Sequence, residues 1–389
     1  MPREPTARPP TGPSPTPQPI TVRSVEAIAL EAPLPRTVET PMARIASTVS
    51  LLVVVTDVDG VEGWGEVWCN FPRFGLHHRA RLVREVLAPA LAGHRFARPA
   101  EAFARLARAT RLLRLQSGEP GPIAAAVAGI DIALHDLEAK RAGQPLWRRL
   151  GGRLGRVEVY ASPGRGTELR PTVEACLARG FRALKLHATG GVAEQLAVVR
   201  PIRELVGPGV ELMLDVDASC EPGPLIAGID ALAQLRLAWL EEPLPADAPD
   251  ALWRRLARAA PMPLACGENF LEQASFERAI AEGSLGVLQP DVTKWGGITL
   301  GLPLARRIVA AGRRFCPNMF SGAPGLLAAA HLLAASGSPD GWLELAVGRQ
   351  PLRDPLLGGP PGGGPLELGE APGLGLEVDR RLLARYRIG

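Results

Sequence analysis

Seven polar residues in the second half of the chain each follow a short apolar segment and recur at a nearly constant interval. Neighbouring members of the set lie 23 to 30 positions apart, which matches one strand–helix unit of a parallel (β/α) barrel. Because barrel strands end at one mouth, the interval predicts that each unit delivers one polar side chain there. A doubly wound open sheet, the main alternative from periodicity alone, would use only groups near its switch point. The residues are Lys185, Asp215, Glu241, Glu268, Asp291, Asn318 and Glu344.

Three consecutive members of this set are acids: Asp215, Glu241 and Glu268. Carboxylates that are held close together do not all ionise unless a cation compensates them. An all-oxygen donor set favours Mg²⁺ over zinc, and three protein oxygens leave positions for water and a bidentate substrate carboxylate. We therefore expect a Mg²⁺ cofactor bound by these acids. The alternative is that they are three unrelated surface or salt-bridged residues.

Such a metal suits the removal of a proton next to a carboxylate. The resulting enediolate carries two negative charges, which a Lewis-acid cation neutralises as they develop. Lys185 and His187 are two positions apart on one expected strand and therefore point to the same face. Lys294 closely follows Asp291 at another strand end. This arrangement predicts candidate bases on opposite sides of the cavity, as proton transfer requires.

Eight short apolar segments alternate with helical patterns after about residue 151, as expected for a parallel barrel with outer helices. The expected strands are Val157–Tyr160, Ala183–His187, Leu212–Val216, Trp239–Pro243, Pro263–Cys266, Gly286–Leu288, Arg314–Pro317 and Trp342–Leu345.

The chain before residue 151 has a different pattern and predicts an α+β region. Ser50–Thr56 is a β-branched run that predicts a strand, and a turn signal follows it before Trp64–Trp68. Apolar residues at helical spacing then follow Pro122 as far as Gly143. Residues 1–20 are rich in proline and predict a disordered tail. The Gly/Pro-rich stretch 358–364 neither follows a strand nor opens a helix, so it is interpreted as a linker.

The composition excludes several classes of protein. With 46% hydrophobic and 22% charged residues and no apolar run long enough to span a bilayer, the chain is expected to be soluble. The N-terminus has no apolar segment typical of a secretory signal, and the five cysteines form no CxxC pair, so we expect a cytoplasmic protein with reduced thiols. The net charge of +4 comes from 44 basic and 40 acidic residues that are intermixed, which argues against a nucleic-acid partner.

Lysine is rare in this chain, where Lys140, Lys185 and Lys294 are the only lysines among 44 basic residues. Arginine does not give up its proton in a protein, whereas a buried lysine can be adjusted into a base. We therefore expect a lysine in this chain to be present because arginine could not replace it. For Lys140, retention by chance is an equally good explanation.

Short motifs in a fixed order give the chain a resemblance to a known family. They are Gly63–Glu66, Ile130–Asp136, Pro145–Gly152, Gly180–Lys185, Leu214–Asp217, Trp239–Pro243, Gly267–Asn269, Gln289–Asp291 with Lys294 and Gly296–Gly297, Leu343–Glu344 and Pro372–Gly375. Each motif is weak alone, but their order and spacing resemble the mandelate racemase and muconate lactonizing subgroups of the enolase superfamily. The likeness extends from about residue 21 to residue 389.

The resemblance implies a fold with two parts. Residues 21–150 would form an α+β capping domain, residues 151–350 a modified (β/α)₇β barrel, and residues 351–389 a segment that returns to the capping domain. Substrate specificity would lie in two capping loops, residues 35–47 with Arg44 and residues 68–78 with Asn70.

The resemblance also implies roles for the site residues. Asp215, Glu241 and Glu268 would bind Mg²⁺, Lys185 would face the substrate carboxylate, and Glu344 would donate a hydrogen bond or a proton to the enediolate.

The chain departs from the family pattern at two catalytic positions. His187 stands where the second lysine of a K-x-K pair is usual, and imidazole, with an ordinary pKa of about 6.5, is a competent base at neutral pH. Asn318 stands where racemase-like members carry histidine, so the dyad with Asp291 is broken and Asn318 is expected to contact substrate. Asp217 occupies a position that often holds asparagine.

The leading hypothesis is a dehydratase of a hydroxy acid, most often an acid sugar, that takes a small carboxylate substrate. A racemase, epimerase or cycloisomerase of a hydroxy acid or sugar lactone is the alternative if Lys294 also acts as a base. An alternative of another class is a barrel that binds Mg²⁺ and a carboxylate without turnover, because Asn318 replaced a base. The family likeness further implies a homo-oligomer.

Overall fold

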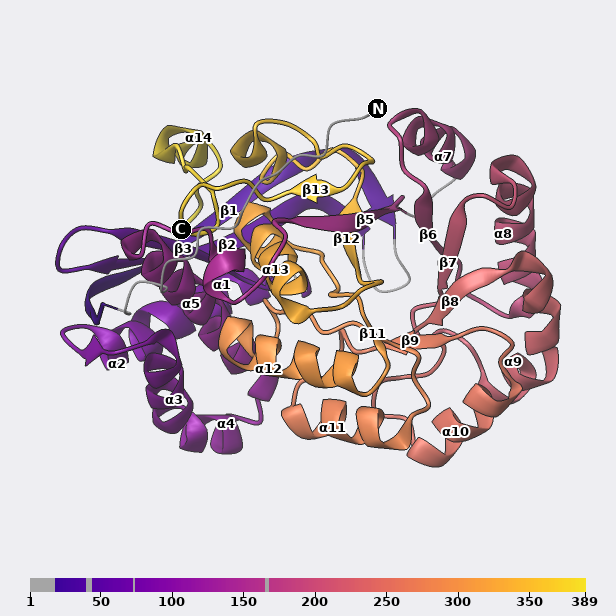
Figure 1. Cartoon of the computed structure of the whole chain (residues 1–389), viewed down its shortest axis with the longest axis horizontal. Helices are drawn as coiled ribbons and strands as arrows, with labels where there is room; N and C mark the ends of the chain where they lie inside the picture. Colours follow the sequence, from indigo (N-terminus) through magenta and orange to yellow (C-terminus); the bar gives the residue numbers. More distant parts are fainter. Residues whose placement is uncertain (1–17, 40–43, 73, 165–167) are drawn as a thin grey trace, which may run out of the picture.

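The chain folds into an antiparallel capping sheet with its helices and a parallel (β/α) barrel (Figure 1). The computed structural model describes residues 18–39, 44–72, 74–164 and 168–389, so nearly all of the expected disordered tail, residues 1–20, lies outside the described residues. The fold class predicted from the sequence, a modified barrel with a capping domain, is confirmed. The domain limits given above stay predictions.

Four strands form the capping sheet in the order β3–β2–β1–β4. They are β1 (Ile20–Glu39), β2 (Arg44–Asp57), β3 (Glu62–Val67) and β4 (Arg95–Phe96), and all pairs are antiparallel. Consecutive residues of β2 are apolar because both faces of the sheet are covered. Leu51 and Val53 face one hydrophobic cluster, whereas Leu52 and Val54 face another, as the two-residue period of a strand requires.

Helices cover one face of this sheet. They are α1 (Gly75–Arg81), the π-helical segment η1 (Leu82–Leu87), α2 (Ala88–Leu91), α3 (Pro99–Ala109), α4 (Arg111–Ser117) and α5 (Pro120–Arg141). Helix α5 lies directly on β3. A Cβ atom added to Gly63 or Gly65 would lie 2.0 Å from the main-chain oxygen of Ala133 or Gly129, respectively. Both glycines are therefore required by close strand–helix packing.

Eight parallel strands form the barrel in the order β11–β10–β9–β8–β7–β6–β5–β12. Their bounds are β5 (Arg156–Ser162), β6 (Ala183–His187), β7 (Glu211–Asp215), β8 (Leu237–Glu241), β9 (Leu264–Cys266), β10 (Val287–Leu288), β11 (Arg314–Phe315) and β12 (Trp342–Ala346). All eight predicted strand segments overlap these. Among the described residues no strand ladder joins β11 to β12, so the barrel is nearly closed.

Helices connect successive barrel strands and form the outer layer (Figure 1). They are α7 (Leu169–Ala178), α8 (Val192–Val206), α9 (Pro222–Gly228), the 3₁₀ segment η2 (Ile229–Leu235), α10 (Asp250–Ala259), α11 (Gln273–Glu282), α12 (Gly297–Ala310) and α13 (Ala323–Ser336). Apolar side chains of the barrel strands pack against those of these helices, and together they form the largest hydrophobic cluster among the described residues.

The C-terminal segment returns to the capping sheet, as expected. It contains η3 (Asp354–Leu357), β13 (Leu366–Glu367) and α14 (Arg380–Ala384), while the short helix α6 (Leu146–Arg149) precedes the barrel. The Ile388 amide donates to the Ala29 carbonyl at 2.9 Å. Leu352 and Leu383 pack against the sheet face that α5 leaves uncovered. Both faces of the capping sheet are thereby buried.

A buried carboxylate at the end of β3 joins the capping sheet to the barrel. Glu66 accepts hydrogen bonds from the amides of Gly322 at 2.7 Å and Gly325 at 3.1 Å, at the start of α13, and from the Ser50 hydroxyl at 2.6 Å. Burial raises the pKa of Glu66, although these hydrogen bonds oppose the shift. The amides at a helix N-terminus lack partners within the helix and favour a negative charge, so Glu66 fixes the position of α13.

Two acids of α5 form equivalent contacts. Asp131 accepts from the amides of Ile298 at 2.8 Å and Thr299 at 2.9 Å, at the start of α12. Asp136 accepts from the Leu374 amide of the C-terminal segment at 2.7 Å. The capping region is therefore fixed to the two helices that follow β10 and β11. The segments between these strands and helices contain Asp291, Lys294 and Asn318 of the predicted site.

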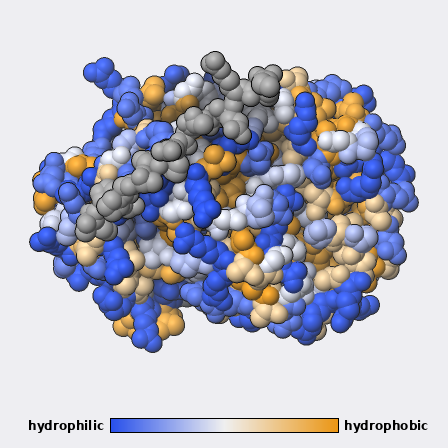
Figure 2. All heavy atoms as spheres, in the orientation of Figure 1, coloured by the Kyte–Doolittle hydropathy of each residue, from blue (hydrophilic) through white to orange (hydrophobic). Residues whose placement is uncertain are grey.

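The visible face of the molecule is largely hydrophilic, with small hydrophobic areas scattered among charged side chains (Figure 2). Large exposed apolar residues lie apart along the chain: Val58 in the turn after β2, Leu112 on α4 and Leu154 in the loop between α6 and β5. In the described part of the chain, no helix combines the length and the apolar character that crossing a membrane requires.

His331 on α13 is a buried histidine held in its neutral form. Its Nδ1 accepts from the Trp147 amide at 2.9 Å, and its Nε2 lies 3.3 Å from the Leu374 carbonyl, to which it donates. Burial lowers the pKa of His331 to about 4. Protonation of Nδ1 would place a donor against the Trp147 N–H, so the folded state excludes the charged form.

We predict that His331 makes the protein less stable in acid. The unfolded histidine binds a proton below about pH 6.5 while the folded one does not, so stability present above that pH falls between about pH 6.5 and 4, by up to about 3 kcal/mol. Urea unfolding at several pH values should show a shallower pH dependence for His331→Gln than for wild type. The exposed-site control His77→Gln should retain the wild-type slope, and an unchanged slope in His331→Gln would contradict the assignment.

Candidate active site

Several predicted site residues stand one layer above an apolar floor inside the barrel. The floor consists of inward-facing residues from successive strands: Tyr160, Ala183, Met213, Trp239, Ala265, Val287 and Cys316. Residues two positions later point in the same direction. Those residues include Ser162, Lys185, Asp215, Glu241, Gln289 and Asn318. The strand period therefore places a ring of polar groups directly above the packed interior, at the C-terminal mouth where barrel enzymes have their sites.

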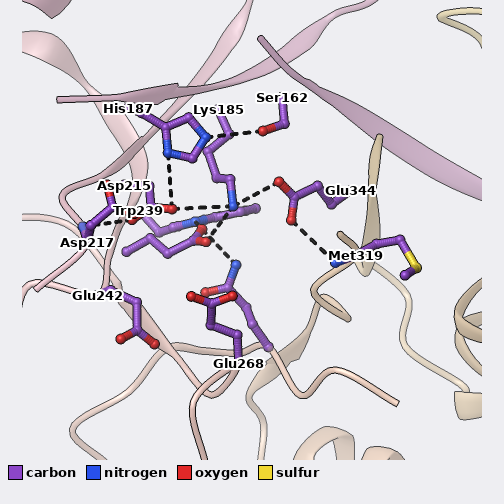
Figure 3. Close-up of polar contacts among 12 residues, drawn as sticks. Ser162, Lys185, His187, Asp215, Asp217, Trp239, Glu242, Glu268, Met319 and Glu344 are labelled. Atoms are coloured by element: carbon purple, nitrogen blue, oxygen red, sulfur yellow. Dashed lines mark hydrogen bonds and ion pairs between the residues drawn. The ribbon is translucent and has the colours of Figure 1, made fainter. Parts of the chain in front are cut away.

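Lys185 is the positive centre of this ring. Its Nζ lies 2.5 Å from Glu241 Oε1, 3.0 Å from Glu344 Oε1 and 3.6 Å from Asp215 Oδ2 (Figure 3). Burial alone would lower the pKa of Lys185, but the surrounding carboxylates outweigh burial and raise this pKa well above its ordinary value. Lys185 is therefore a fixed ammonium group and is unsuited to act as a base at neutral pH.

Glu241 is the most constrained acid of the mouth. Besides the contact with Lys185, its Oε2 accepts hydrogen bonds from Trp239 Nε1 at 2.8 Å and from Gln289 Nε2 at 2.7 Å. Burial raises the pKa of Glu241 to about 8, even though Lys185 opposes the shift. Additional positive charge beside this carboxylate would favour its ionised form.

His187, the last residue of β6, is partly exposed at the mouth. Its Nε2 lies 3.2 Å from Ser162 Oγ, and its Nδ1 lies 3.3 Å from Asp215 Oδ2 (Figure 3). The other oxygen of Asp215 accepts from the Asp217 amide at 2.9 Å. The hydrogen bond with Ser162 places the imidazole beside Lys185, as their positions on one strand predicted, while Nδ1 makes no hydrogen bond within the described chain.

A second group of polar residues lies on the opposite side of the mouth. Asn269 Nδ2 donates to Glu268 Oε1 at 3.1 Å and to Glu242 Oε2 at 3.4 Å, while its Oδ1 accepts from Lys294 Nζ at 3.0 Å. The Lys294 ammonium lies 4.6 Å from the centre of the Trp68 ring. Burial raises the pKa of Glu242 to about 7, and the neighbouring Glu268 adds to the shift.

Asp291 and Asn318 are buried but form no hydrogen bond with each other in the described structure. Asp291 Oδ1 accepts from the amide and the hydroxyl of Thr293 at 2.8 and 2.6 Å. Its Oδ2 and the Asn318 Nδ2 are buried and have no hydrogen-bond partner within the described chain. Burial raises the pKa of Asp291, although Lys294 opposes the shift. An unpaired buried amide and carboxylate are costly, so both are suited to bind a ligand.

Of the two predicted substrate contacts in the capping loops, Asn70 and Arg44, the structure describes the side chain of Asn70. Asn70 Nδ2 donates to the main-chain oxygen of Phe320, in the loop after β11. Arg44 begins β2, but its side chain lies outside the described part of the structure. A shallow pocket that is partly open to solvent lies between the capping sheet and the barrel loops. Its polar lining includes Thr48, Ser50, Asn70, Ser321, Gln350 and Arg353.

Two overlapping groups of side chains could hold a divalent cation. The predicted ligands Asp215, Glu241 and Glu268 come from the ends of β7, β8 and β9, and all offer oxygen atoms. One potential ligand atom each from His187, Asp215 and Asp217 lies within 4.8 Å of the others, whereas Asp215, Glu241 and Glu268 do not form such a group among the described residues. The excess of buried acid around a single lysine fits a cation at the mouth, because burial already raises the pKa of Glu241 to about 8.

The barrel with a capping sheet and acids at the strand ends defines a class of metal-assisted barrel enzymes, and sequence comparison specifies the family. Residues 23–151 match the N-terminal domain of mandelate racemase and muconate lactonizing enzymes. Residues 168–382 match the enolase C-terminal domain-like family. The chain therefore belongs to the mandelate racemase and muconate lactonizing family of the enolase superfamily, as its motifs predicted.

Curated relatives of known activity are moderately similar. The D-galactarolactone cycloisomerase of Agrobacterium fabrum is 28% identical over 94% of this chain and 99% of its own length. A D-galactonate dehydratase of Pectobacterium atrosepticum is 30% identical over 72% of this chain and 74% of its own length.

Solved structures share the whole fold. A mandelate racemase/muconate lactonizing enzyme from Bordetella bronchiseptica is 45% identical, with a TM-score of 0.86 over 95% of this chain and 99% of that one. An enolase from Bradyrhizobium, solved with magnesium and mandelic acid, is 28% identical, with a TM-score of 0.82 over 95% of this chain and 99% of that one.

Sequence reasoning missed several residues of the site. Ser162 lies two positions after the floor residue Tyr160, so the strand period could have identified it. Asn269 and Glu242 directly follow the predicted metal ligands Glu268 and Glu241. Their polar character was the only feature of the sequence that could have indicated a place in the site. The Lys294–Trp68 contact joins the barrel to the capping region, and no sequence period indicates such a long-range pair.

We predict that removal of the Lys185 charge strongly destabilises the fold. Lys185→Met leaves Glu241, Glu344 and Asp215 without their shared cation, which should cost about 3–5 kcal/mol of unfolding free energy, measured by urea denaturation without added metal. The control is Lys140→Met, since Asp136, the partner of Lys140 at 2.7 Å, keeps main-chain donors. Equal losses in the two variants would contradict the central role of Lys185.

Proposed function

We propose that this protein abstracts the proton α to the carboxylate of a hydroxy acid and then eliminates the β-hydroxyl, which makes it an acid-sugar dehydratase. The observation that carries the proposal is the pairing of a fixed ammonium, Lys185, with an adjacent imidazole, His187, above an acidic strand-end cluster. The Lys185 ammonium would hold the negatively charged substrate, and the His187 imidazole would supply the base.

The residues around Lys185 can each be given a role. Lys185 would bind the substrate carboxylate, His187 would take the α-proton, and Glu344, 3.0 Å from Lys185, would donate a hydrogen bond or proton to the enediolate. Elimination then needs a general acid for the leaving hydroxyl, and protonated His187 can return its proton for that purpose. One base therefore suffices for dehydration.

Mg²⁺ is the cofactor of the proposal, held by Asp215, Glu241 and Glu268. When bound, it would supply positive charge at the carboxylate end of the substrate. The oxygen-only donor set and the magnesium in the Bradyrhizobium relative support this assignment. Asp217 and His187 border the same space, so the ligand set needs a direct test.

The opposite side of the substrate is assigned to Lys294. Asn318 cannot act as a base, and Asp291 is bound to Thr293 rather than to a histidine. The unpaired Asn318 amide would instead donate to a substrate oxygen. If Lys294 also removes a proton, epimerisation or cycloisomerisation becomes possible from the same first step, and the likeness to the Agrobacterium cycloisomerase favours this as the second candidate.

The shallow pocket between the capping sheet and the barrel loops offers polar groups for a substrate with several hydroxyl groups. Its lining includes hydroxyl and amide groups from Thr48, Asn70, Ser321 and Gln350, which suit a polyhydroxylated chain better than an aryl group. The activities named for the two curated relatives, on galactarolactone and galactonate, support an acid sugar. A six-carbon acid sugar is therefore the first substrate to test.

We predict that Mg²⁺ raises the thermal stability of the wild-type protein, by about 2.7 kcal/mol when its concentration is a hundred times Kd. Asp215→Asn and Glu268→Gln should abolish the Mg²⁺-dependent shift in melting temperature, because each removes a charged ligand oxygen. The matched variants Asp217→Asn and His187→Ala should keep the shift. The reverse pattern would transfer the cation to the His187, Asp215 and Asp217 group.

We predict that the wild-type enzyme exchanges the α-proton of an acid sugar in D₂O, as followed by NMR over a library of such acids. His187→Ala should slow the exchange of the preferred substrate by about 10²–10⁴-fold, the usual contribution of a positioned base. The product, a 2-keto-3-deoxy acid or a cyclised isomer, decides between the two candidates.

Equal exchange by wild type and His187→Ala would refute the assignment of the base. Absence of exchange, with the Mg²⁺ shift retained, would favour the non-catalytic barrel, and recovery of activity in Asn318→His would establish that a base had been lost.

A further inference from the structure

The Lys294 ammonium is held by two groups that come from different parts of the chain. Lys294 lies in the segment between β10 and α12 and is 8% exposed. Asn269, after β9, accepts its hydrogen bond at 3.0 Å, and the ring of Trp68, just after capping strand β3, lies 4.6 Å from its Nζ. A capping residue therefore contacts a proposed base of the barrel.

Trp68 is itself fixed on both sides of the domain junction. Its amide donates to the Thr293 carbonyl at 3.2 Å, one residue before Lys294. The guanidinium of the buried Arg79, on α1, lies 5.4 Å from the ring centre. Arg79 in turn donates to the Gly75 carbonyl at 3.2 Å. The indole therefore has a defined position relative to the Lys294 backbone.

An aromatic ring at this distance attracts an ammonium group, and the attraction is larger where water is excluded. A lysine side chain is otherwise a flexible stem that carries a point charge. Asn269 supplies one acceptor and Trp68 supplies an extended negative surface, so together they restrict where Nζ can lie. Catalysis depends strongly on such placement, because a proton is transferred only over hydrogen-bond distance.

We infer that Trp68 is a positioning residue through which the capping region orients Lys294 and thereby sets the reactivity on one face of the substrate. The inference rests on the second candidate function only for the role of Lys294 as a base. The contact itself is independent of that function. Loss of the ring should weaken reaction on the Lys294 face and leave the His187 face intact.

The contact can be tested without any activity measurement, because the chain has three lysines. Protein labelled with ¹³C at lysine Cε gives three sets of signals, and Lys294→Arg assigns one of them. The ring current of Trp68 should hold the Lys294 Hε signal upfield of that of Lys140. Trp68→Leu should move this signal downfield, whereas Trp68→Phe should retain part of the shift.

A matched control is Trp64→Leu, which removes another indole of the capping sheet. The Trp64 ring lies 5.3 Å from the Arg380 guanidinium, so this variant also loses a cation–ring contact, but away from Lys294. The Lys294 signal should not move in Trp64→Leu. A Lys294 signal that is unshifted in wild type, or unchanged by Trp68→Leu, overturns the inference.

The functional consequence is measured with the two α-epimers of the preferred acid, which present the α-proton to opposite faces. Trp68→Leu should reduce exchange on the Lys294 face by about tenfold to thirtyfold, with exchange on the His187 face within about twofold of wild type. Equal losses on both faces, or no loss, overturn the positioning role. If wild type exchanges only the epimer that faces His187, Lys294 is not a base and the effect of Trp68 on reactivity is overturned. If wild type exchanges neither epimer, the proposed function fails, and the Lys294 signal still decides whether Trp68 positions the lysine.

Discussion

Buried carboxylates bound to main-chain amides at the starts of two barrel helices determine how the whole molecule is assembled. Glu66 binds the start of α13 and Asp131 the start of α12. These helices follow the strands that lead to Asn318 and to the Asp291–Lys294 segment. The same contacts therefore join the two parts of the protein and fix the loops of the mouth. The family motifs around Glu66 and Asp131 are explained by this junction and not by direct chemistry.

The mouth of the barrel carries more negative than positive charge in its buried part. Lys185 is shared among three carboxylates, and burial raises the pKa of both Glu241 and Glu242. This excess is costly in a folded protein unless something compensates it. A cation binds most strongly where carboxylates are already close together and removed from water. The excess negative charge would therefore favour the binding of a cation, and the bound cation would favour an anionic substrate.

The sequence predicted the features that depend on period and missed those that depend on distance in space. The interval between Lys185 and Glu344 predicted the barrel, because one residue per strand end is a local rule. The position of His187 beside Lys185 followed from the strand period in the same way. Neither Ser162 nor the contact of Trp68 with Lys294 was predicted. The strand period could have identified Ser162, but the expected strand ended at Tyr160 and the observed strand β5 continues to Ser162. The contact of Trp68 with Lys294 needed the docking of two regions more than 200 residues apart.

The helix starts at α12 and α13 are occupied from within the protein. Free amides at such positions commonly attract phosphate or carboxylate groups, but here Asp131 and Glu66 already neutralise them. An incoming acid therefore gains nothing from these two dipoles. In the proposed function, recognition of an acid would therefore depend on charged side chains and on the cation that the strand-end acids would hold, and not on these two helix starts.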